Sequence, residues 1–292
     1  AEIYGTVEQE ADAEAIAVGM DILENVGLKE YQVLINNRKL IEGFLFEIGV
    51  ASPELREETI RVIDKLRKIA KQEMVNELSK IGLTSDAINR IIEFISIRGK
   101  PSEVLREVER RKLKDVTALK GYDELANLAE AIEALGKSGK CIYDLSIVRG
   151  IGYYDGIVFE AYDKGGEDIG SIFGGGRYDK LCSIYGKRDV PATGVAGGIE
   201  RLIISLERAS IFPKLSQSPK AFVVAVNDDV RQKTMEIVQF LRNSGVPADF
   251  DLKRRTLAKQ LEYADSIAIP FAIIVGQREI EKGIVKLRDM TK

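Results

Sequence analysis

Apolar residues recur at helical spacing near the start of the chain. Residues 11–28 carry an apolar face that ends at a glycine, and this spacing predicts an amphipathic helix. The shorter apolar run 31–35, closed by two asparagines, predicts a strand, and a second helix is expected over 38–48. The first fifty or so residues are therefore expected to form a helix, a strand and a helix.

The next stretch, 51–135, changes character. Ser52-Pro53-Glu54 offers an N-cap, a proline at the first helical position and an early acidic residue. Ile60 and Ile63 follow at helical spacing, and Gly82 marks the end of that helical pattern. No segment here has the pattern of a strand, so we expect a helical block inserted between elements of a sheet.

Short β-rich runs alternate with glycine clusters in the stretch that follows. The runs predicted as strands are 141–148, 157–162, 171–173 and 192–196, and a helix is expected over 200–206. The first two runs follow one another through a tight connection, which is typical of an antiparallel sheet.

The last part of the chain has a different order of elements. Residues 213–219 have the composition of a linker. Beyond them, strands are predicted at 221–226, 247–252, 271–276 and 284–288, with helices at 228–244 and 257–268. Strands separated by helices of this length indicate βαβ units and a largely parallel sheet. The predicted fold class is thus α+β with an antiparallel sheet, followed by an α/β module.

The amino-acid composition excludes several kinds of catalytic and metal site. The chain has 292 residues, a net charge of −3, two cysteines and no histidine. Without histidine, a Ser-His-Asp or Cys-His nucleophile within this chain and a zinc site that needs imidazole are excluded. Cys141 and Cys182 are too few for a four-thiolate zinc site, and so low a cysteine content suits a reducing cytoplasm.

The lengths of the apolar runs and the distribution of charge along the chain indicate which kinds of partner it can bind. The longest apolar runs, such as 221–226, are too short to span a bilayer. From Pro213 onward there are fourteen Lys and Arg against ten Asp and Glu, so a basic C-terminal module follows an acidic body.

Three glycine-rich segments, 149–156, 173–179 and 194–201, each carry arginine. Taken singly, they are also explained by a hairpin with surface tyrosines, a loose turn, and tight packing of a strand against a helix. Taken together, they indicate a cleft in which glycines let a ligand approach the backbone and arginines hold phosphate oxygens. An arginine-based site for phosphate chemistry is coherent with the absence of histidine.

These segments resemble signatures of the histidyl-tRNA synthetases, a family of class II aminoacyl-tRNA synthetases. Arg149-Gly150-Ile151-Gly152-Tyr153-Tyr154, followed by 156–160, resembles the histidine-specificity motif. Residues 174–179 resemble the second glycine-rich signature, and 194–201 are similar to motif 3 of class II synthetases. Residues 2–5 resemble the strand just after motif 2.

The resemblance covers essentially the whole chain and implies its domain organisation. A class II catalytic core would have a first part at 1–50 and a second part at 136–212, separated by a helical insertion domain at 51–135. The linker at 213–219 would lead to an α/β anticodon-binding domain at 220–292.

The resemblance also implies the site residues. Arg149 would contact the α-phosphate of ATP, and Arg201 would hold the γ-phosphate, which makes these two the catalytic residues. Gly197 and Gly198 would complete the ATP site. Glu2 would bind the α-ammonium group of histidine. Further histidine-binding residues would be Tyr153, Tyr154, Gly174 and Tyr178.

The implied activity is histidine–tRNA ligation, in which histidine reacts with ATP and passes to the 3′ end of tRNA(His). ATP is then a substrate, accompanied by Mg²⁺, with no metal site in the chain itself. Basic residues of the C-terminal module would bind the tRNA, and they are Lys253, Arg254, Arg255 and Lys259. The full-length protein would be a cytoplasmic homodimer that does not bind membranes.

Some positions depart from the family pattern. Gly152 stands where many members have Asp, and Asp155 stands where many have Thr or Asn. The chain also begins after motifs 1 and 2, so we expect a fragment that is inactive in adenylation by itself.

Two alternatives remain open. One is a non-catalytic paralogue such as the regulatory subunit of ATP phosphoribosyltransferase, although such paralogues tend to lose the catalytic arginines and the anticodon domain. The other is a synthetase-like RNA sensor.

Overall fold

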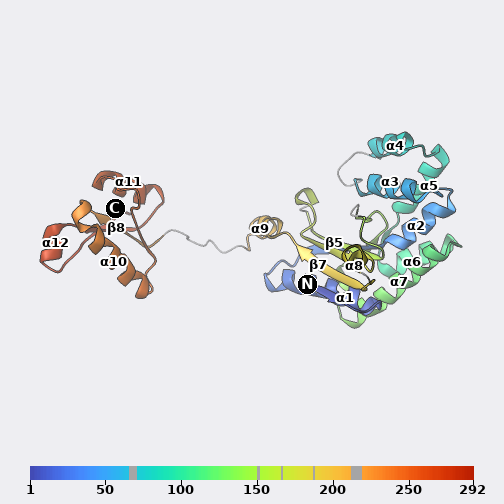
Figure 1. Ribbon diagram of the computed structural model, residues 1–292, viewed down its shortest axis with the longest axis horizontal. Helices are drawn as coiled ribbons and strands as arrows, with labels where there is room; N and C mark the ends of the chain where they lie inside the picture. The colour runs from blue at the N-terminus through green and yellow to red at the C-terminus, as the bar shows by residue number, and fades with distance from the viewer. Residues whose placement is uncertain (66–70, 150–151, 166, 187, 212–218) are drawn as a thin grey trace. The chain divides into compact units, whose positions relative to one another are not determined.

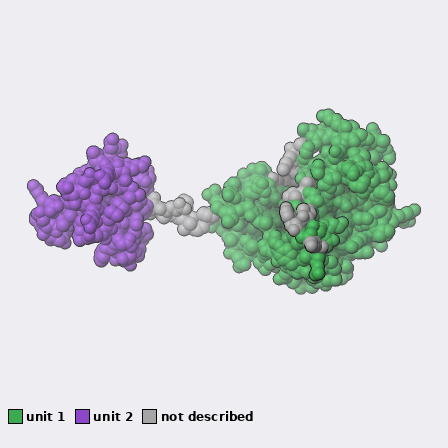
Figure 2. All heavy atoms as spheres, viewed as in Figure 1, with its two compact units in different colours: residues 1–213 green, residues 214–292 purple. Residues whose placement is uncertain are grey.

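The computed structural model describes residues 1–65, 71–149, 152–165, 167–186, 188–211 and 219–292. The chain divides into two compact units, an N-terminal unit, Ala1–Pro213, and a C-terminal unit, Lys214–Lys292 (Figure 1, Figure 2). The predicted linker lies almost entirely outside the described residues, as do Gly150 and Ile151 of the first arginine-bearing segment.

A seven-stranded mixed sheet forms the centre of the N-terminal unit, in the order β1-β7-β6-β5-β2-β4-β3. Its neighbouring strands run antiparallel, except that β2 and β4 are parallel. The strands are β1 (Glu2–Tyr4), β2 (Tyr31–Asn37), β3 (Arg98–Gly99), β4 (Cys141–Asp144), β5 (Ile157–Asp163), β6 (Phe173–Arg177) and β7 (Ala192–Gly197).

The sheet corrects three expectations from the sequence. The strands β4 and β5 follow one another along the chain, but they do not pair, because β2 lies between them. A two-residue strand, β3, interrupts the stretch predicted to be helical throughout and pairs with β4. The three glycines Gly174, Gly175 and Gly176 lie inside β6 and make ladder pairs on both sides, so they form no loose turn.

Helices cover one face of this sheet, and the core lies between. The apolar sides of α1 (Gln9–Asn25), α2 (Arg38–Glu47) and α7 (Val116–Ala134) share a hydrophobic core with inward side chains of the strands. Glycines let α2 and α7 approach closely, since a Cβ at Gly121 would lie 2.4 Å from the backbone nitrogen of Leu40. The helix α7, expected in the insertion, thus packs on the core helices α1 and α2.

Two of the remaining helices of the N-terminal unit, α3 and α5, begin at capping residues. Ser52 and Thr84 accept backbone hydrogen bonds as N-caps, and Pro53 occupies the first turn. Helices α3, α4 and α5 gather at one end of the unit (Figure 1). These elements are α3 (Pro53–Asp64), α4 (Lys71–Lys80), α5 (Ser85–Ile95), α6 (Pro101–Arg110), α8 (Leu181–Tyr185) and α9 (Ile199–Arg208).

The C-terminal unit has a four-stranded sheet in the order β11-β10-β8-β9. The three strands β8, β9 and β10 are parallel, as predicted, and β11 is antiparallel to β10. Helix α10 covers one face and α11 the other, while the short α12 was not predicted. The elements are β8 (Ala221–Ala225), α10 (Arg231–Asn243), β9 (Ala248–Phe250), α11 (Leu257–Ser266), β10 (Phe271–Val275), α12 (Gln277–Glu281) and β11 (Lys286–Asp289).

Candidate active site

The sheet face turned away from the core helices is unusually bare, because three of its positions are glycine. Gly174 and Gly176 of β6 alternate with core-facing residues, and Gly194 of β7 pairs with Gly176. Side chains stand directly over these positions: a Cβ at Gly174 would lie 2.3 Å from Arg149 Nη1, and one at Gly176 would lie 2.8 Å from the Tyr154 ring. We call this surface the glycine face.

Arg149 reaches the glycine face from the connection after β4. Its backbone has φ 44°, in the left-handed region that side-chain-bearing residues rarely adopt. The guanidinium donates from Nη1 to Glu160 Oε1 at 2.7 Å and lies 5.5 Å from the centre of the Tyr154 ring. Among the described residues, its buried Nε has no hydrogen-bond partner. The guanidinium is thus paired with Glu160 and lies near Tyr154, with its side chain 18 % exposed.

Three tyrosines form a cluster beside Arg149. The rings of Tyr153 and Tyr154 lie 4.4 Å apart, and Tyr178 meets them edge-on at 5.9 and 6.3 Å. Burial, followed by the hydrogen bond from Tyr153, raises the pKa of Tyr154, so it stays a neutral hydroxyl at physiological pH. Such a cluster supplies aromatic surface and hydroxyls that a polar ring can bind.

Glu2 lies at the other end of the glycine face. It pairs across the ladder with Gly194, where a Cβ would lie 2.8 Å from Glu2 Cγ and 3.2 Å from Tyr178 Oη. Tyr4 donates a hydrogen bond to the Glu2 carboxylate. The Tyr178 hydroxyl is buried and has no hydrogen-bond partner within the described part of the chain. Burial, followed by the nearby Glu2 carboxylate, raises the Tyr178 pKa.

Arg201 enters from the first turn of α9, whose N-cap is Gly198. Its Nη1 donates to the backbone oxygen of Ser171 at 2.9 Å, and Ser171 Oγ donates to Glu160 Oε1 at 3.4 Å. Glu160 also accepts a hydrogen bond from Arg149. The two guanidiniums therefore contact residues of the same segment, which runs from β5 to the start of β6. Thus Arg149 and Arg201 are linked through Glu160 and Ser171.

Gly197 and Gly198 take a different place. Together with Phe173, Val195 and Ile199 they line an apolar cavity of about 310 Å³ beside α1. Among the described residues that line this cavity are neither Arg149 and Arg201 nor the three tyrosines or Glu2. The cavity therefore does not connect the two glycines to the predicted phosphate contacts.

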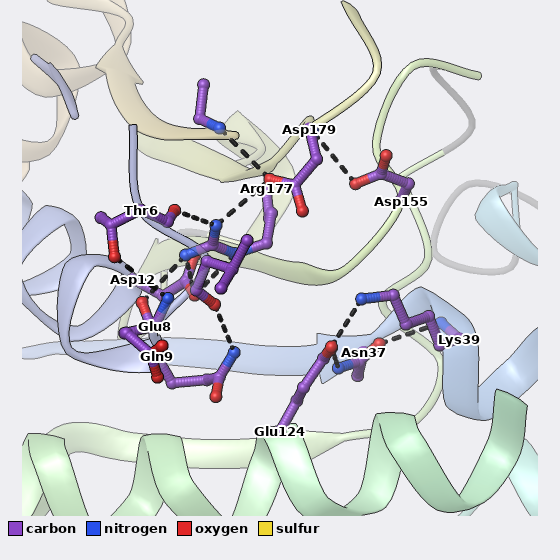
Figure 3. Close-up of polar contacts among 12 residues, drawn as sticks. Thr6, Glu8, Gln9, Asp12, Asn37, Lys39, Glu124, Asp155, Arg177 and Asp179 are labelled. Atoms are coloured by element: carbon purple, nitrogen blue, oxygen red, sulfur yellow. Dashed lines mark hydrogen bonds and ion pairs between the residues drawn. The ribbon is translucent and has the colours of Figure 1, made fainter. Parts of the chain in front are cut away.

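A buried ion pair between β6 and α1 was missed from the sequence (Figure 3). Arg177 is 1 % exposed and donates from Nε and Nη2 to Asp12 Oδ2 of α1 at 3.0 and 2.8 Å. It also donates to the backbone oxygens of Thr6 and Glu8, at 2.8 and 3.0 Å, and to Asp179 at 3.2 Å. Arg177 thereby ties β6 to the segment that follows β1. Strand alternation from Phe173 was the signal, since it places position 177 on the core face.

The predicted basic cluster of the C-terminal unit is divided between two roles. Lys253 and Lys259 are exposed, and the Arg254 side chain is 74 % exposed with φ 53°. Arg255 differs, because it lies 3.5 Å from Asp251 and stacks 4.3 Å from the Tyr263 ring centre. Arg255 thus has structural contacts, whereas the other three are exposed, with Arg254 Nη1 lying 4.0 Å from Asp228 Oδ2.

The described residues hold neither a cluster of metal-binding side chains nor a membrane-spanning helix. Within the described residues, no group of three or more Asp, Glu or Cys side chains has the spacing to hold a metal ion. In the same part of the chain, the helices are too short or too polar to span a membrane.

Comparison with known proteins places this site in a family. A family model described as histidyl-tRNA synthetase matches residues 1–202, and one described as anticodon binding domain matches residues 220–292. A histidine–tRNA ligase of Pyrococcus furiosus is 37 % identical over 289 residues, and one of Thermococcus kodakarensis is 38 % identical over 291 residues. Both alignments cover 99 % of this chain, which spans 66 % of the length of each relative.

Solved structures agree on the fold. The histidyl-tRNA synthetase from Nostoc sp. PCC 7120 superposes with a TM-score of 0.68 at 30 % identity, covering 99 % of this chain and 68 % of that one. An ATP phosphoribosyltransferase regulatory subunit/histidyl-tRNA synthetase from Bacillus halodurans C has a TM-score of 0.63 at 24 % identity, over 91 % of this chain and 65 % of that one, and shows the fold alone. With a class II catalytic core followed by an anticodon-binding domain, the chain belongs to the histidyl-tRNA synthetase family.

Proposed function

We propose that the protein containing this chain is a histidine–tRNA ligase. In the first step, a carboxylate oxygen of histidine attacks the α-phosphorus of ATP, the bond to the bridging oxygen breaks, and pyrophosphate leaves. In the second step, a hydroxyl of the terminal adenosine of tRNA(His) attacks the histidyl carbonyl, loses its proton, and AMP leaves. The main support is the glycine face, which gathers Glu2, three tyrosines and Arg149 on one bare surface.

The histidine subsite lies between the tyrosines and Glu2. In this proposal, Glu2 binds the α-ammonium group through a charge-assisted hydrogen bond. The unpartnered Tyr178 hydroxyl and the Tyr153–Tyr154 pair contact the imidazole. Gly174 leaves room beside them. A polar pocket of this kind rejects apolar amino acids, because its buried hydroxyls would then lack partners.

The ATP subsite lies over Arg149 and Arg201. Arg149 stabilises the charge that develops on the α-phosphate during attack, and Arg201 holds the γ-phosphate. Mg²⁺ fits this arrangement as an ion carried by the phosphates, since it binds few protein ligands when phosphate oxygens are available. When bound, it offsets phosphate charge. Gly197 and Gly198 are assigned to the ATP site by their place in the motif alone.

The C-terminal unit is assigned to tRNA binding. Lys253, Arg254 and Lys259 are exposed and can contact phosphates, and such binding weakens steeply with salt. A homodimer and a cytoplasmic location complete the proposal, and the free state of Cys141 and Cys182 suits a reducing compartment.

The decisive test is ATP–pyrophosphate exchange on the intact protein, followed by charging of tRNA(His). We expect exchange that requires L-histidine and falls about 100–1,000-fold, to a rate that is still measurable, on Arg149→Met. Glu130→Gln is a matched surface control, since Glu130 is exposed on α7. Histidine binding without exchange would refute the ligase and favour the regulatory-subunit alternative.

A further inference from the structure

Glu160 is an unassigned carboxylate at the centre of the candidate site. Its side chain is 18 % exposed and extends from β5 onto the glycine face. Oε1 accepts from Arg149 Nη1 at 2.7 Å and from Ser171 Oγ at 3.4 Å, while Oε2 accepts from Tyr162 Oη at 2.6 Å. Both oxygens are thus engaged, and one of them pairs with a proposed catalytic group.

The contact with Arg149 has a defined geometry. Glu160 pairs with Gly174 across the β5–β6 ladder, and a Cβ at Gly174 would overlap Arg149 Nη1 at 2.3 Å. The guanidinium therefore lies across a position that only glycine leaves open, held there by Glu160. Since this bond uses Nη1, the buried Nε keeps its donor capacity for another acceptor.

Glu160 also lies between the two arginines. Ser171 contacts Glu160 through its hydroxyl and accepts from Arg201 Nη1 through its backbone oxygen at 2.9 Å. Glu160 therefore contacts Arg149 directly, whereas its link to Arg201 runs only through Ser171. The carboxylate itself is a poor phosphate ligand, because like charges repel.

We infer that Glu160 is a positioning residue for adenylation, acting through Arg149, and this rests on the function proposed above. An arginine side chain loses much rotamer freedom when it is fixed. Glu160 fixes it before ATP arrives, so the donors are already aimed where charge develops in the transition state. Loss of this contact lowers the rate of the chemical step more than it weakens binding of histidine.

The test is a double-mutant cycle on the intact protein, measured by histidine-dependent pyrophosphate exchange with active-site titration. Glu160→Gln keeps the size and removes the charge. We expect kcat per active site to fall about 10–100-fold, on the scale of one charge-assisted hydrogen bond, with KM for histidine changed by less than about twofold. In an Arg149→Met background the same change should cost nothing further.

Two further variants distinguish a positioning role of Glu160 from a loss of folding. Glu160→Asp keeps the charge on a shorter side chain and should recover part of the rate. Tyr162→Phe removes one bond to Glu160, and should lower kcat about 3–10-fold, again only when Arg149 is present. A purely structural Glu160 would lower the number of active sites and leave kcat per site unchanged.

The outcomes separate the two proposals. A wild-type rate within twofold for Glu160→Gln, or losses that add to that of Arg149→Met, would overturn the positioning role while the ligase proposal stands. No exchange by the wild-type protein would overturn both.

Discussion

Replacing Arg177 by methionine should destabilise the N-terminal unit severely. The guanidinium is 1 % exposed and Asp12 is fully buried, so the substitution leaves a carboxylate without its counter-ion in the core. Removing one partner of a buried pair costs about 3–5 kcal/mol. The backbone oxygens of Thr6 and Glu8 lose their donors as well.

The cost should depend on pH in a defined direction. Burial raises the pKa of Asp12 to about 6, while Arg177 acts to lower it. Without Arg177 the pKa rises further, so the folded variant binds a proton that the unfolded chain, with a pKa of about 3.9, has released. A raised folded-state pKa stabilises the fold at low pH, and this contribution disappears as pH rises toward that pKa. Arg177→Met should therefore cost less at pH 5 than at pH 8.

Urea unfolding followed by circular dichroism measures this, with the transition of the C-terminal unit as an internal reference. The double variant Arg177→Met/Asp12→Leu removes both charges and should be more stable than Arg177→Met at pH 8. A single variant that loses less than about 1 kcal/mol, or a double variant that is no more stable than it, would refute the buried-pair reasoning.

Three further predictions concern ligands. Glu2→Gln should raise KM for histidine about 10–100-fold in pyrophosphate exchange, because the amino acid loses a charged partner. KM for ATP should change by less than about twofold. Equal effects on the two KM values would contradict the proposed histidine subsite. Gly174→Ala should lower kcat at least about 10-fold, since its Cβ would displace the Arg149 guanidinium, whereas Gly139→Ala faces open space and should match wild type. Arg254→Glu should weaken tRNA binding, reduce the salt dependence of that binding and leave adenylation unchanged. Filter binding at several salt concentrations measures this, and an unchanged tRNA affinity would contradict a phosphate contact by Arg254.

Local pattern explains why many elements were predictable. Helical spacing and the caps at Ser52 and Thr84 located helices, because these signals act within one or two turns. The alternation of strands and helices beyond residue 220 predicted the parallel sheet correctly, since parallel neighbours require long crossovers. Arg149, Glu2 and Tyr178 were singled out by resemblance of short motifs, and the structure gathers them on one face.

Long-range contacts explain the misses. The separation of β4 from β5 depends on β2, which comes about a hundred residues earlier in the chain. Arg255 has the same charge as Arg254, and only the tertiary contacts with Asp251 and Tyr263 distinguish the two. Glu160 lies in the motif segment 156–160 but was assigned no role from the sequence, because its importance lies in what it touches.

Sequence alone determined most of the elements, the two-part organisation and the kinds of side chain available for chemistry, because periodicity, capping and composition are properties of neighbouring residues. Tertiary structure alone decided that Arg177 is buried against Asp12 while Arg149 lies over Gly174 beside Glu160. Whether an arginine stabilises the core or is presented to a ligand depends on the sheet face and on partners far along the chain. Those follow from strand order and register, which no local pattern contains.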